Sequence, residues 1–173
     1  MIKLETKRLI IRELDFKDVD DLFEMDSDVE VHKYVSDDVV KTKDEIIEVI
    51  KMLKAQYLET GVGRWAVVDK KTNECLGWCG LKLCKEPLNN HSNFYDFGYR
   101  LKRKHWSKGY ATESSRVIID YGFKTLKLNS IYATTDINNK ASKNVLTKLG
   151  FEHKEVFEDE GYLCDWFELR QNQ

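Results

Sequence analysis

Hydrophobic and polar residues follow two spacings along the chain, and together these predict seven strands and four helices. Short runs rich in β-branched and aromatic residues, bounded by turn-forming residues, predict strands. Their ranges are 7–13, 64–69, 75–83, 94–101, 130–135, 151–157 and 162–169. Hydrophobic residues that recur every three or four positions predict helices at 15–25, 42–60, 111–124 and 139–149. Asp15 and Thr42 are the expected N-caps of the first two helices, and Gly61 and Gly150 are expected to follow helix ends.

The order of these elements predicts the fold class. Strands and helices alternate over residues 94–157, and a strand–helix–strand segment implies at least one parallel strand pair. One proline, and the absence of low-complexity stretches or repeats, indicate no linker between separate domains. We therefore expect a single domain over residues 1–173, of class α/β (α+β), in which helices flank a mixed sheet.

The composition of the chain limits the classes of molecule that it is expected to bind. Hydrophobic residues make up 42% of the 173 residues, which is enough for a sizeable core, and the net charge of −2 favours neither nucleic acid nor an anionic membrane. No apolar run is long enough to span a membrane, and the charged opening does not resemble a signal peptide, so a cytoplasmic protein is expected. Cys75, Cys79, Cys84 and Cys164 lack metal-ligand spacing, which predicts reduced thiols and no metal site.

The segment 101–113 is the first candidate for chemistry. A strand ends there, a basic stretch follows, and a helix begins near Gly109, so the unpaired N–H groups of its first turn could bind phosphate. Gly109 and Ala111 keep bulk away, while Lys102, Lys104 and Lys108 add positive charge. From these residues alone, a solvated basic loop before an ordinary helix is an equally good interpretation. The sequence contains neither of two glycine-rich nucleotide-binding motifs, Gly-x-x-x-x-Gly-Lys-[Ser/Thr] and Gly-x-Gly-x-x-Gly.

The segment 139–151 is the second candidate. Ala141, Val145 and Leu149 form a buried stripe, and Asn139 and Ser142 lie on a neighbouring face. The residues alone favour a structural interpretation in which Asn139 is an N-cap and Ser142 an ordinary first-turn residue.

Taken together, the two segments resemble the GNAT acetyltransferases, in particular the subgroup of ribosomal-protein alanine N-acetyltransferases. The family's pyrophosphate motif, Gln/Arg-x-x-Gly-x-Gly/Ala, corresponds to Trp106-Ser107-Lys108-Gly109-Tyr110-Ala111, with Thr112-Glu113 following as in the subgroup. Asn-x-x-Ser and Lys-Leu-Gly-Phe match within 139–151, the opening 5–12 resembles the subgroup's first strand, and 96–99 resembles its fourth. The resemblance implies a mostly antiparallel seven-stranded sheet that splays apart between strands 94–101 and 130–135.

The resemblance also implies a site for acetyl-CoA. Its pantetheine arm would pair with the backbone of Tyr99, Arg100 and Leu101 in the splay, where a backbone N–H would face the acetyl carbonyl. The residues expected around the phosphates are Trp106, Ser107, Lys108, Gly109, Tyr110, Ala111 and Thr112, and Asn139 and Ser142 complete the cofactor-binding set.

The catalytic residues implied by the resemblance are Asp96 and Ser142. Asp96 stands where the family has a strand-four carboxylate and is either the general base or a structural ion-pair partner; His105 and Tyr121 are weaker candidates for the base. Leu146 occupies the position at which many family members have a general-acid tyrosine, so that role does not transfer. Ser142 is the expected hydrogen-bond donor to the departing sulfur.

The acceptor stays open at this stage. The predicted first helix and its continuation are acidic, as is the turn at 158–160, and this acidity would suit a cationic acceptor or be ordinary surface. A protein N-terminal α-amine and a small amine such as a polyamine or aminoglycoside are both compatible, and so is a non-catalytic CoA-binding module. Dimers are common in the subgroup, and Trp65, Trp78, Phe94 and Trp166 are candidates for either a dimer interface or the core.

Overall fold

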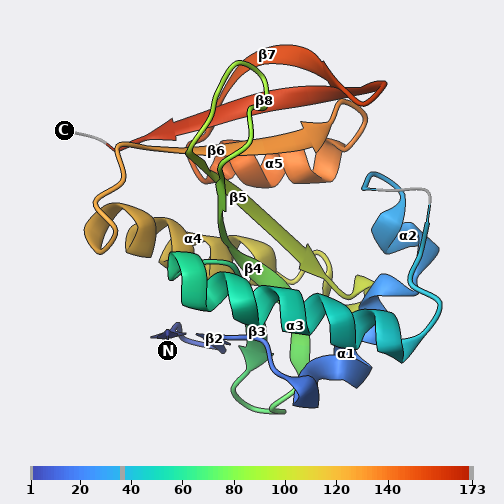
Figure 1. Cartoon of the computed structure of the whole chain (residues 1–173). Coiled ribbons are helices and arrows are strands. Elements are labelled where there is room, and N and C mark those ends of the chain that lie inside the picture. Colours follow the sequence, from blue (N-terminus) through green and yellow to red (C-terminus); the bar gives the residue numbers. More distant parts are fainter. Residues whose placement is uncertain (1, 36–37, 172–173) are drawn as a thin grey trace.

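The computed structural model describes residues 2–35 and 38–171, and the predicted α/β class is confirmed. Eight strands form one sheet in the order β1-β2-β3-β4-β5-β6-β8-β7. The strands are β1 (Lys3–Glu5), β2 (Leu9–Arg12), β3 (Arg64–Asp69), β4 (Cys75–Cys84), β5 (Phe94–Leu101), β6 (Ser130–Asp136), β7 (Glu152–Asp159) and β8 (Tyr162–Arg170). The helices are α1 (Val19–Asp26), α2 (Val29–His32), α3 (Lys43–Thr60), α4 (Tyr110–Lys124) and α5 (Lys140–Lys148), with short 3-10 helices η1 (Phe16–Asp18) and η2 (Arg103–His105). Figure 1 shows their arrangement.

The count of seven strands was wrong by one. The extra edge strand, β1, is only three residues long, and Leu4, its one hydrophobic residue, lies opposite Ile11 of β2. So short a segment carries no alternating pattern, and it is a strand only because β2 offers it a partner.

The helices at the start of the chain also differ from the prediction. Asp15 caps the first helical segment as predicted, with Asp18 completing a capping box, but the first turn is the 3-10 helix η1, which continues directly into α1. The short helix α2, which was not predicted, follows separately. The prediction for α3 is confirmed in detail. Thr42 forms a capping box with Glu45, and Gly61 ends the helix in the left-handed conformation at φ 72°.

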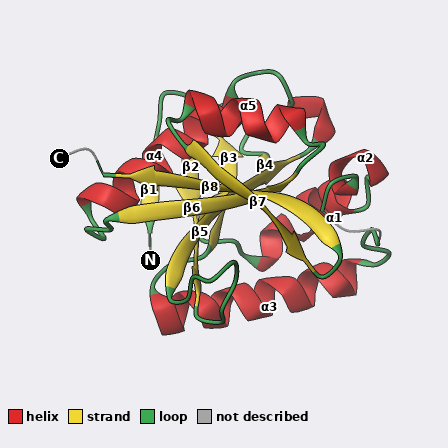
Figure 2. Cartoon of the chain, turned by 90° about the horizontal axis from the view of Figure 1, so that it is seen from above, coloured by secondary structure: helices red, strands yellow, loops and turns green. Residues whose placement is uncertain are grey.

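The sheet consists of two parts that meet at β5 and β6. Every neighbouring pair is antiparallel except β5 with β6, which is parallel and matched at a single position, Asp96 opposite Tyr132. Figure 1 shows β5 running diagonally away from β6, which confirms the expected splay. Figure 2 shows α4 and α5 on one side of the strands and α3 on the other.

The hydrophobic core explains why these elements assemble. Ile46, Ile50 and Leu53 of α3 are buried against one face of the sheet, and Ile118 of α4 against the other. Gly122 brings α4 close to β6, since a Cβ on this residue would lie 2.9 Å from Ile131 Cδ1. The packing therefore holds the last turns of α4 against the start of β6.

Candidate active site

The loop between β5 and α4 has the geometry of an anion-binding helix start. Ser107 and Gly109 both have positive φ, at 58° and 79°, and Tyr110 begins α4 directly after them. Gly109 is the N-cap and supplies no side-chain hydrogen bond to the first turn. The first N–H groups of α4 therefore have no cap from this position and remain available to an anion.

Two motifs that lie far apart in the sequence hold this loop together. Glu113 of α4 accepts hydrogen bonds from Thr6 Oγ1 at 2.5 Å, Arg8 N at 2.9 Å and Arg8 Nε at 2.6 Å. Arg8 Nη1 also donates to the Lys108 carbonyl at 3.0 Å, and the guanidinium lies 4.2 Å from the centre of the Tyr110 ring. Burial alone would raise the pKa of Glu113, but these hydrogen bonds lower it below its ordinary value. We call this set the Arg8–Glu113 clamp.

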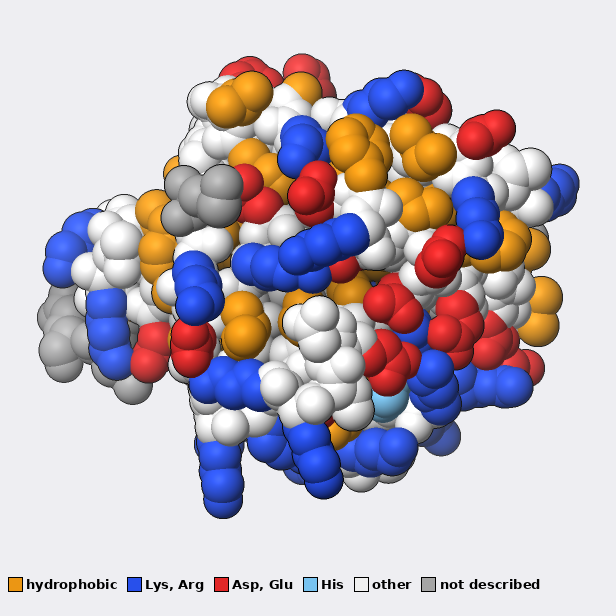
Figure 3. Space-filling model, turned by 90° about the horizontal axis from the view of Figure 1, so that it is seen from below, with side chains coloured by type: hydrophobic (Ala, Val, Ile, Leu, Met, Phe, Trp, Pro, Cys, Tyr) orange, Lys and Arg blue, Asp and Glu red, His pale blue; other side chains and the backbone are white. Residues whose placement is uncertain are grey.

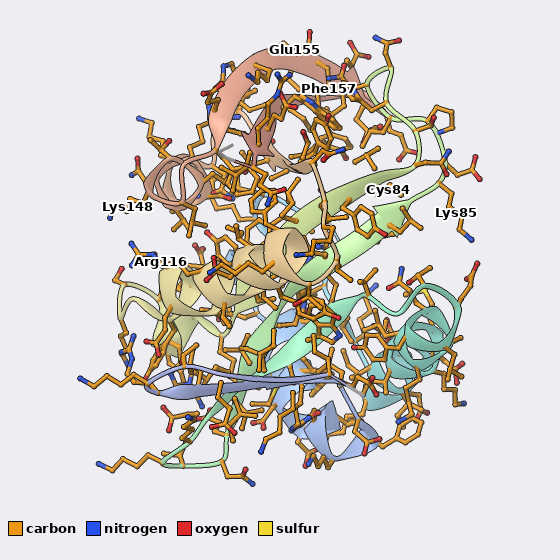
Figure 4. The ribbon with its side chains drawn as sticks, turned by 90° about the vertical axis from the view of Figure 1, so that its left-hand side faces the viewer. Cys84, Lys85, Arg116, Lys148, Glu155 and Phe157 are labelled. Atoms are coloured by element: carbon orange, nitrogen blue, oxygen red, sulfur yellow. The ribbon has the colours of Figure 1, made fainter. Side chains whose placement is uncertain are left out.

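An open hollow adjoins the start of α4. It has a volume of about 530 Å³, and its lining residues are Thr6, Gly109, Thr112, Glu113, Arg116, Val117 and Asp120. Arg116, one turn after Thr112, was not singled out from the sequence, because a lone arginine on a helix carries no motif. Figure 4 shows Arg116 on α4 and Lys148 on α5 toward the same side of the molecule.

The basic run before α4 is largely neutralised inside the protein, contrary to the expectation that it serves phosphate. Lys102 is buried and contacts Asp21, Glu24 and Glu74, and Lys104 contacts Glu24 and Glu74 at 2.8 Å each. The sequence could not show this because the acidic partners lie in α1 and in the β3–β4 turn. Lys108, in contrast, is exposed in the loop.

The opening between β5 and β6 brings several predicted residues together. Tyr99, Arg100 and Leu101 pair with Cys79, Trp78 and Gly77 of β4 but have no register partner on β6. Their backbone on the β6 side is therefore placed to receive an added strand-like chain.

Ser142 faces this opening from α5. The Asn139 side chain caps α5 by accepting a hydrogen bond from Ser142 N at 3.0 Å. Burial raises the pKa of Tyr99 to about 12, while a hydrogen bond with the Ser142 side chain acts in the opposite direction. The Tyr99 side chain is thus a partner of Ser142 that was not foreseen, since only its backbone was expected to take part.

Asp96 lies on the opposite face of β5 and forms an ion pair with Arg64 of β3. Arg64 Nη1 also donates to the carbonyls of Gly80 at 2.8 Å and Asp96 at 3.0 Å. Gly98 makes room for this guanidinium, because a Cβ there would lie 3.1 Å from it. Burial raises the pKa of Asp96 above its ordinary value, and Arg64 opposes that rise.

The weaker base candidates are held in other contacts. His105 Nε2 lies 3.3 Å from Glu74 Oε1, at the basic loop, and Tyr121 packs edge-on against Trp65 with ring centres 5.6 Å apart. Asp96, which is also paired, differs from them in lying at the point where β5 meets β6.

The acidic start of the chain does not form a free acidic surface. Asp26 accepts a hydrogen bond from Arg100 Nη1 at 2.7 Å and lies 3.3 Å from His32 Nε2. The other ion pairs join Asp15 to Lys54, Asp18 to Arg12, Asp20 to Lys43, Asp21 and Glu24 to Lys102, and Asp28 to Arg103. Figure 3 shows acidic and basic side chains interspersed on the lower face of the molecule. Most of the acids between Asp15 and Asp28 are therefore paired with cations of the same chain.

Most of the proposed interface aromatics belong to the core. Trp65, Trp166 and Phe94 are buried within the chain, and Trp78 is half-buried between the guanidinium groups of Arg64 and Arg100, at 5.2 and 5.3 Å from its ring centre. The four cysteines are free thiols, as predicted. Within residues 2–35 and 38–171, no helix is long and apolar enough to cross a membrane.

Comparison with known proteins places this geometry in a family. A sequence model of the acetyltransferase (GNAT) domain matches residues 8–152. An uncharacterized N-acetyltransferase, p20, from Bacillus licheniformis is 33% identical over 159 residues, which cover 92% of this chain and 87% of that protein. The FsC-acetyl coenzyme A-N(2)-transacetylase of Aspergillus fumigatus is 30% identical over 158 residues, which cover 89% of this chain and 66% of that protein. A GNAT-family acetyltransferase structure from Bacillus anthracis superimposes with a TM-score of 0.81 at 24% identity, covering 98% of each chain.

The Arg8–Glu113 clamp predicts a pH-dependent loss of stability. Because folding lowers the pKa of Glu113, its stabilising effect is present above the ordinary carboxyl pKa near 4.5 and is lost as the pH falls below it. Glu113→Gln should lower the free energy of unfolding by roughly 2 kcal/mol at pH 7, and the difference from the wild type should shrink toward pH 3. Urea denaturation at both pH values measures this. Asp120→Asn, an exposed change on the same helix, is the control, and an equal effect of Glu113→Gln at both pH values would contradict the prediction.

Proposed function

The chain belongs to the GNAT acetyltransferases and is thus an acyltransferase, and from this premise we propose that it moves the acetyl group of acetyl-CoA to a primary amine by direct attack in a ternary complex. One observation carries the proposal: the opening between β5 and β6 has the uncapped start of α4 on one side of the sheet and Asp96 on the other. A phosphate-bearing thioester and an amine can therefore approach the same point from opposite faces.

The proposed pose of acetyl-CoA follows from the residues around the opening. Backbone N–H groups from Ser107 to Thr112 hold the pyrophosphate, at the positive end of the α4 dipole. The side chains of Thr112 and Arg116 line the adjoining hollow and are placed for further phosphate contacts. The pantetheine amides pair with β5 from Tyr99 to Leu101, which carries the thioester toward Ser142.

The proposed chemistry needs only modest help from the protein. The amine nitrogen attacks the thioester carbonyl carbon, the C–N bond forms, and the negative charge on the oxygen is stabilised by a backbone N–H of β5. The C–S bond then breaks, and the thiolate accepts a hydrogen bond from the Ser142 hydroxyl. The proton lost by the amine passes to Asp96, directly or through water, and then to solvent.

The ion pair of Asp96 with Arg64 favours an acceptor amine of low pKa. Arg64 stabilises the ionised carboxylate and so limits its strength as a base. An α-amine with a pKa near 8 costs about 1.4 kcal/mol to deprotonate at pH 7, whereas a lysine-type amine near 10.4 costs about 4.6 kcal/mol. We therefore favour an α-amine, as in a protein N-terminus, over a polyamine or an aminoglycoside.

Three further points support this acceptor. The acids of α1 are paired with cations of the same chain, so they do not form a surface for a polycation. The related Aspergillus protein is named for N(2) transfer from acetyl coenzyme A. The resemblance to ribosomal-protein alanine N-acetyltransferases also favours an α-amine acceptor. The same resemblance leads us to propose a soluble enzyme of the cytoplasm.

Release of free CoA from acetyl-CoA in the presence of different amines tests the function. The panel is an alanine-initiated peptide, its N-terminally blocked form, spermidine and kanamycin. We expect release with the free peptide only. Release with spermidine or kanamycin alone would contradict the acceptor class, and CoA binding without release from any amine would favour a binding module.

Gly109→Val should abolish acetyl-CoA binding. Valine is disfavoured at φ 79° and would place its side chain at the start of α4, where the phosphates are expected. Calorimetry with CoA measures the effect, with Gly161→Ala as the control because Gly161 also has positive φ but lies in the β7–β8 turn. Wild-type affinity in Gly109→Val would refute the phosphate site.

Ser142→Ala should lower kcat about tenfold or more and leave the KM for acetyl-CoA nearly unchanged, because its hydroxyl is expected to act on the leaving sulfur. Steady-state kinetics at saturating cofactor measures this. Thr147→Ala, an exposed change on the same helix, is the control. An unchanged kcat would remove Ser142 from the mechanism.

A further inference from the structure

Lys102 is a buried lysine in a segment that leads directly into the proposed phosphate loop. Only 2% of its side chain is exposed, and its Nζ lies 2.6 Å from Asp21 Oδ1, 2.8 Å from Glu24 Oε2 and 2.9 Å from Glu74 Oε1. Two of these carboxylates come from α1, and the third from the turn between β3 and β4. The ammonium therefore joins three separate parts of the chain.

This arrangement excludes Lys102 as a phosphate ligand. An ammonium group has three N–H donors, and the three carboxylates use all of them. Burial by itself lowers the pKa of Lys102, but the carboxylates raise it above its ordinary value, so the group stays charged. Its positive charge is neutralised by carboxylates of the same chain.

The carboxylates depend on Lys102 as much as it depends on them. One oxygen from each of Asp21, Glu24 and Glu74 lies within 4.8 Å of the others, which would be repulsive without a cation between them. Burial alone would raise the pKa of Glu74, but hydrogen bonds from Lys104, Lys102 and His105 lower it to about 2. Lys102 thus occupies the place that a metal ion takes in an all-carboxylate site.

The backbone around Lys102 passes this anchoring on to the loop. Lys102 N donates to Leu76 O at 2.9 Å, His105 N donates to Lys102 O at 2.9 Å, and Trp106 Nε1 donates to Leu101 O at 2.8 Å. The next residues are Ser107 and Gly109, whose positive φ angles set the start of α4. Movement at Lys102 would therefore displace the N–H groups proposed to hold pyrophosphate.

We propose that Lys102 is a positioning residue for acetyl-CoA: its ammonium anchors the start of the phosphate loop to α1 and to the β3–β4 turn. The inference rests on the proposed function, since it gives that loop its ligand. It also joins the two sides of the reaction. The helix that holds Lys102 also holds Arg100 through Asp26, on the face of the sheet proposed for the acceptor.

Lys102→Ala and Lys104→Ala form a matched pair for testing the anchor. Both changes remove one positive charge beside the same Glu24 and Glu74, but Lys104 is half exposed and Lys102 is buried. Calorimetry with CoA should show an affinity at least about tenfold weaker for Lys102→Ala, because a small displacement of the loop misplaces several N–H donors. Lys104→Ala should bind within about threefold of the wild type.

Calcium distinguishes loss of the positive charge at position 102 from loss of packing, because a bound cation can replace the charge but not the side chain. Ca²⁺ binds oxygen at about 2.4 Å, so two ligands on opposite sides of it lie about 4.8 Å apart, as the carboxylates here can. Millimolar Ca²⁺ should raise the Tm of Lys102→Ala and recover most of its CoA affinity, with no effect on the wild type. If Lys102→Ala does not fold, Glu74→Gln takes its place in the comparison of CoA affinities. Because Glu74→Gln retains Lys102, the calcium measurement is not made on it.

The outcomes separate this inference from the proposed function. Wild-type CoA affinity in Lys102→Ala, an equal loss in Lys104→Ala, or a loss that Ca²⁺ does not reverse would overturn the anchoring role. If the wild type itself does not bind CoA, the proposed function fails. Hydrogen exchange still tests the anchor in that case: amides 103–109 should exchange faster in Lys102→Ala, and unchanged exchange would overturn it.

Discussion

The parallel contact between β5 and β6 is the constraint on which the site depends. Every other pair of neighbouring strands in the sheet is antiparallel and is paired over three or more residues. β5 and β6 are paired only at Asp96 and Tyr132. Beyond that point the backbone of β5 has a partner on one side only. A parallel connection also requires a crossover, and α4 provides it, so the helix starts where β5 ends. The opening and the anion-binding helix start therefore have one topological cause.

Many charged side chains near the end of β5 form ion pairs with one another. The basic residues that follow β5 pair with nearby acids: Lys102 and Lys104 with acids of α1, and Arg103 with Asp28, just after α1. Within the described part of the chain, the backbone N–H groups at the start of α4 have no such carboxylate partners, and Lys108 and Arg116 lie near them. Under the proposed function, these groups would bind the pyrophosphate locally in a protein whose net charge is −2.

Elements defined by local rules were predictable from the sequence. Thr42 and Gly61 bound α3 because capping and the left-handed conformation depend on the residue and its immediate neighbours. The resemblance to the GNAT family was visible in the sequence because the residues 106–111 that carry it are contiguous. Contacts between distant segments were not predictable: Arg8 and Glu113 are 105 residues apart, and Lys102 and Asp21 are 81 apart. From the sequence alone, Lys102 and Lys108 look alike, and only folding shows that one is buried.

The ion pair of Asp96 with Arg64 depends on the shape of the sheet. Arg64 can reach across β4 to Asp96 because Gly98 has no side chain in the path of the guanidinium, while Gly80, opposite Gly98, lets the backbone at Gly63 approach β4 closely. The same guanidinium lies 5.2 Å from the centre of the Trp78 ring, on the face of the sheet that also carries Asp96. Burial raises the pKa of Asp96 above its ordinary value, and Arg64 opposes that rise. Under the proposed function, a carboxylate whose basicity Arg64 limits in this way suits an amine that is already partly deprotonated at neutral pH, so the proposed acceptor class depends on the ion pair for which Gly98 makes room.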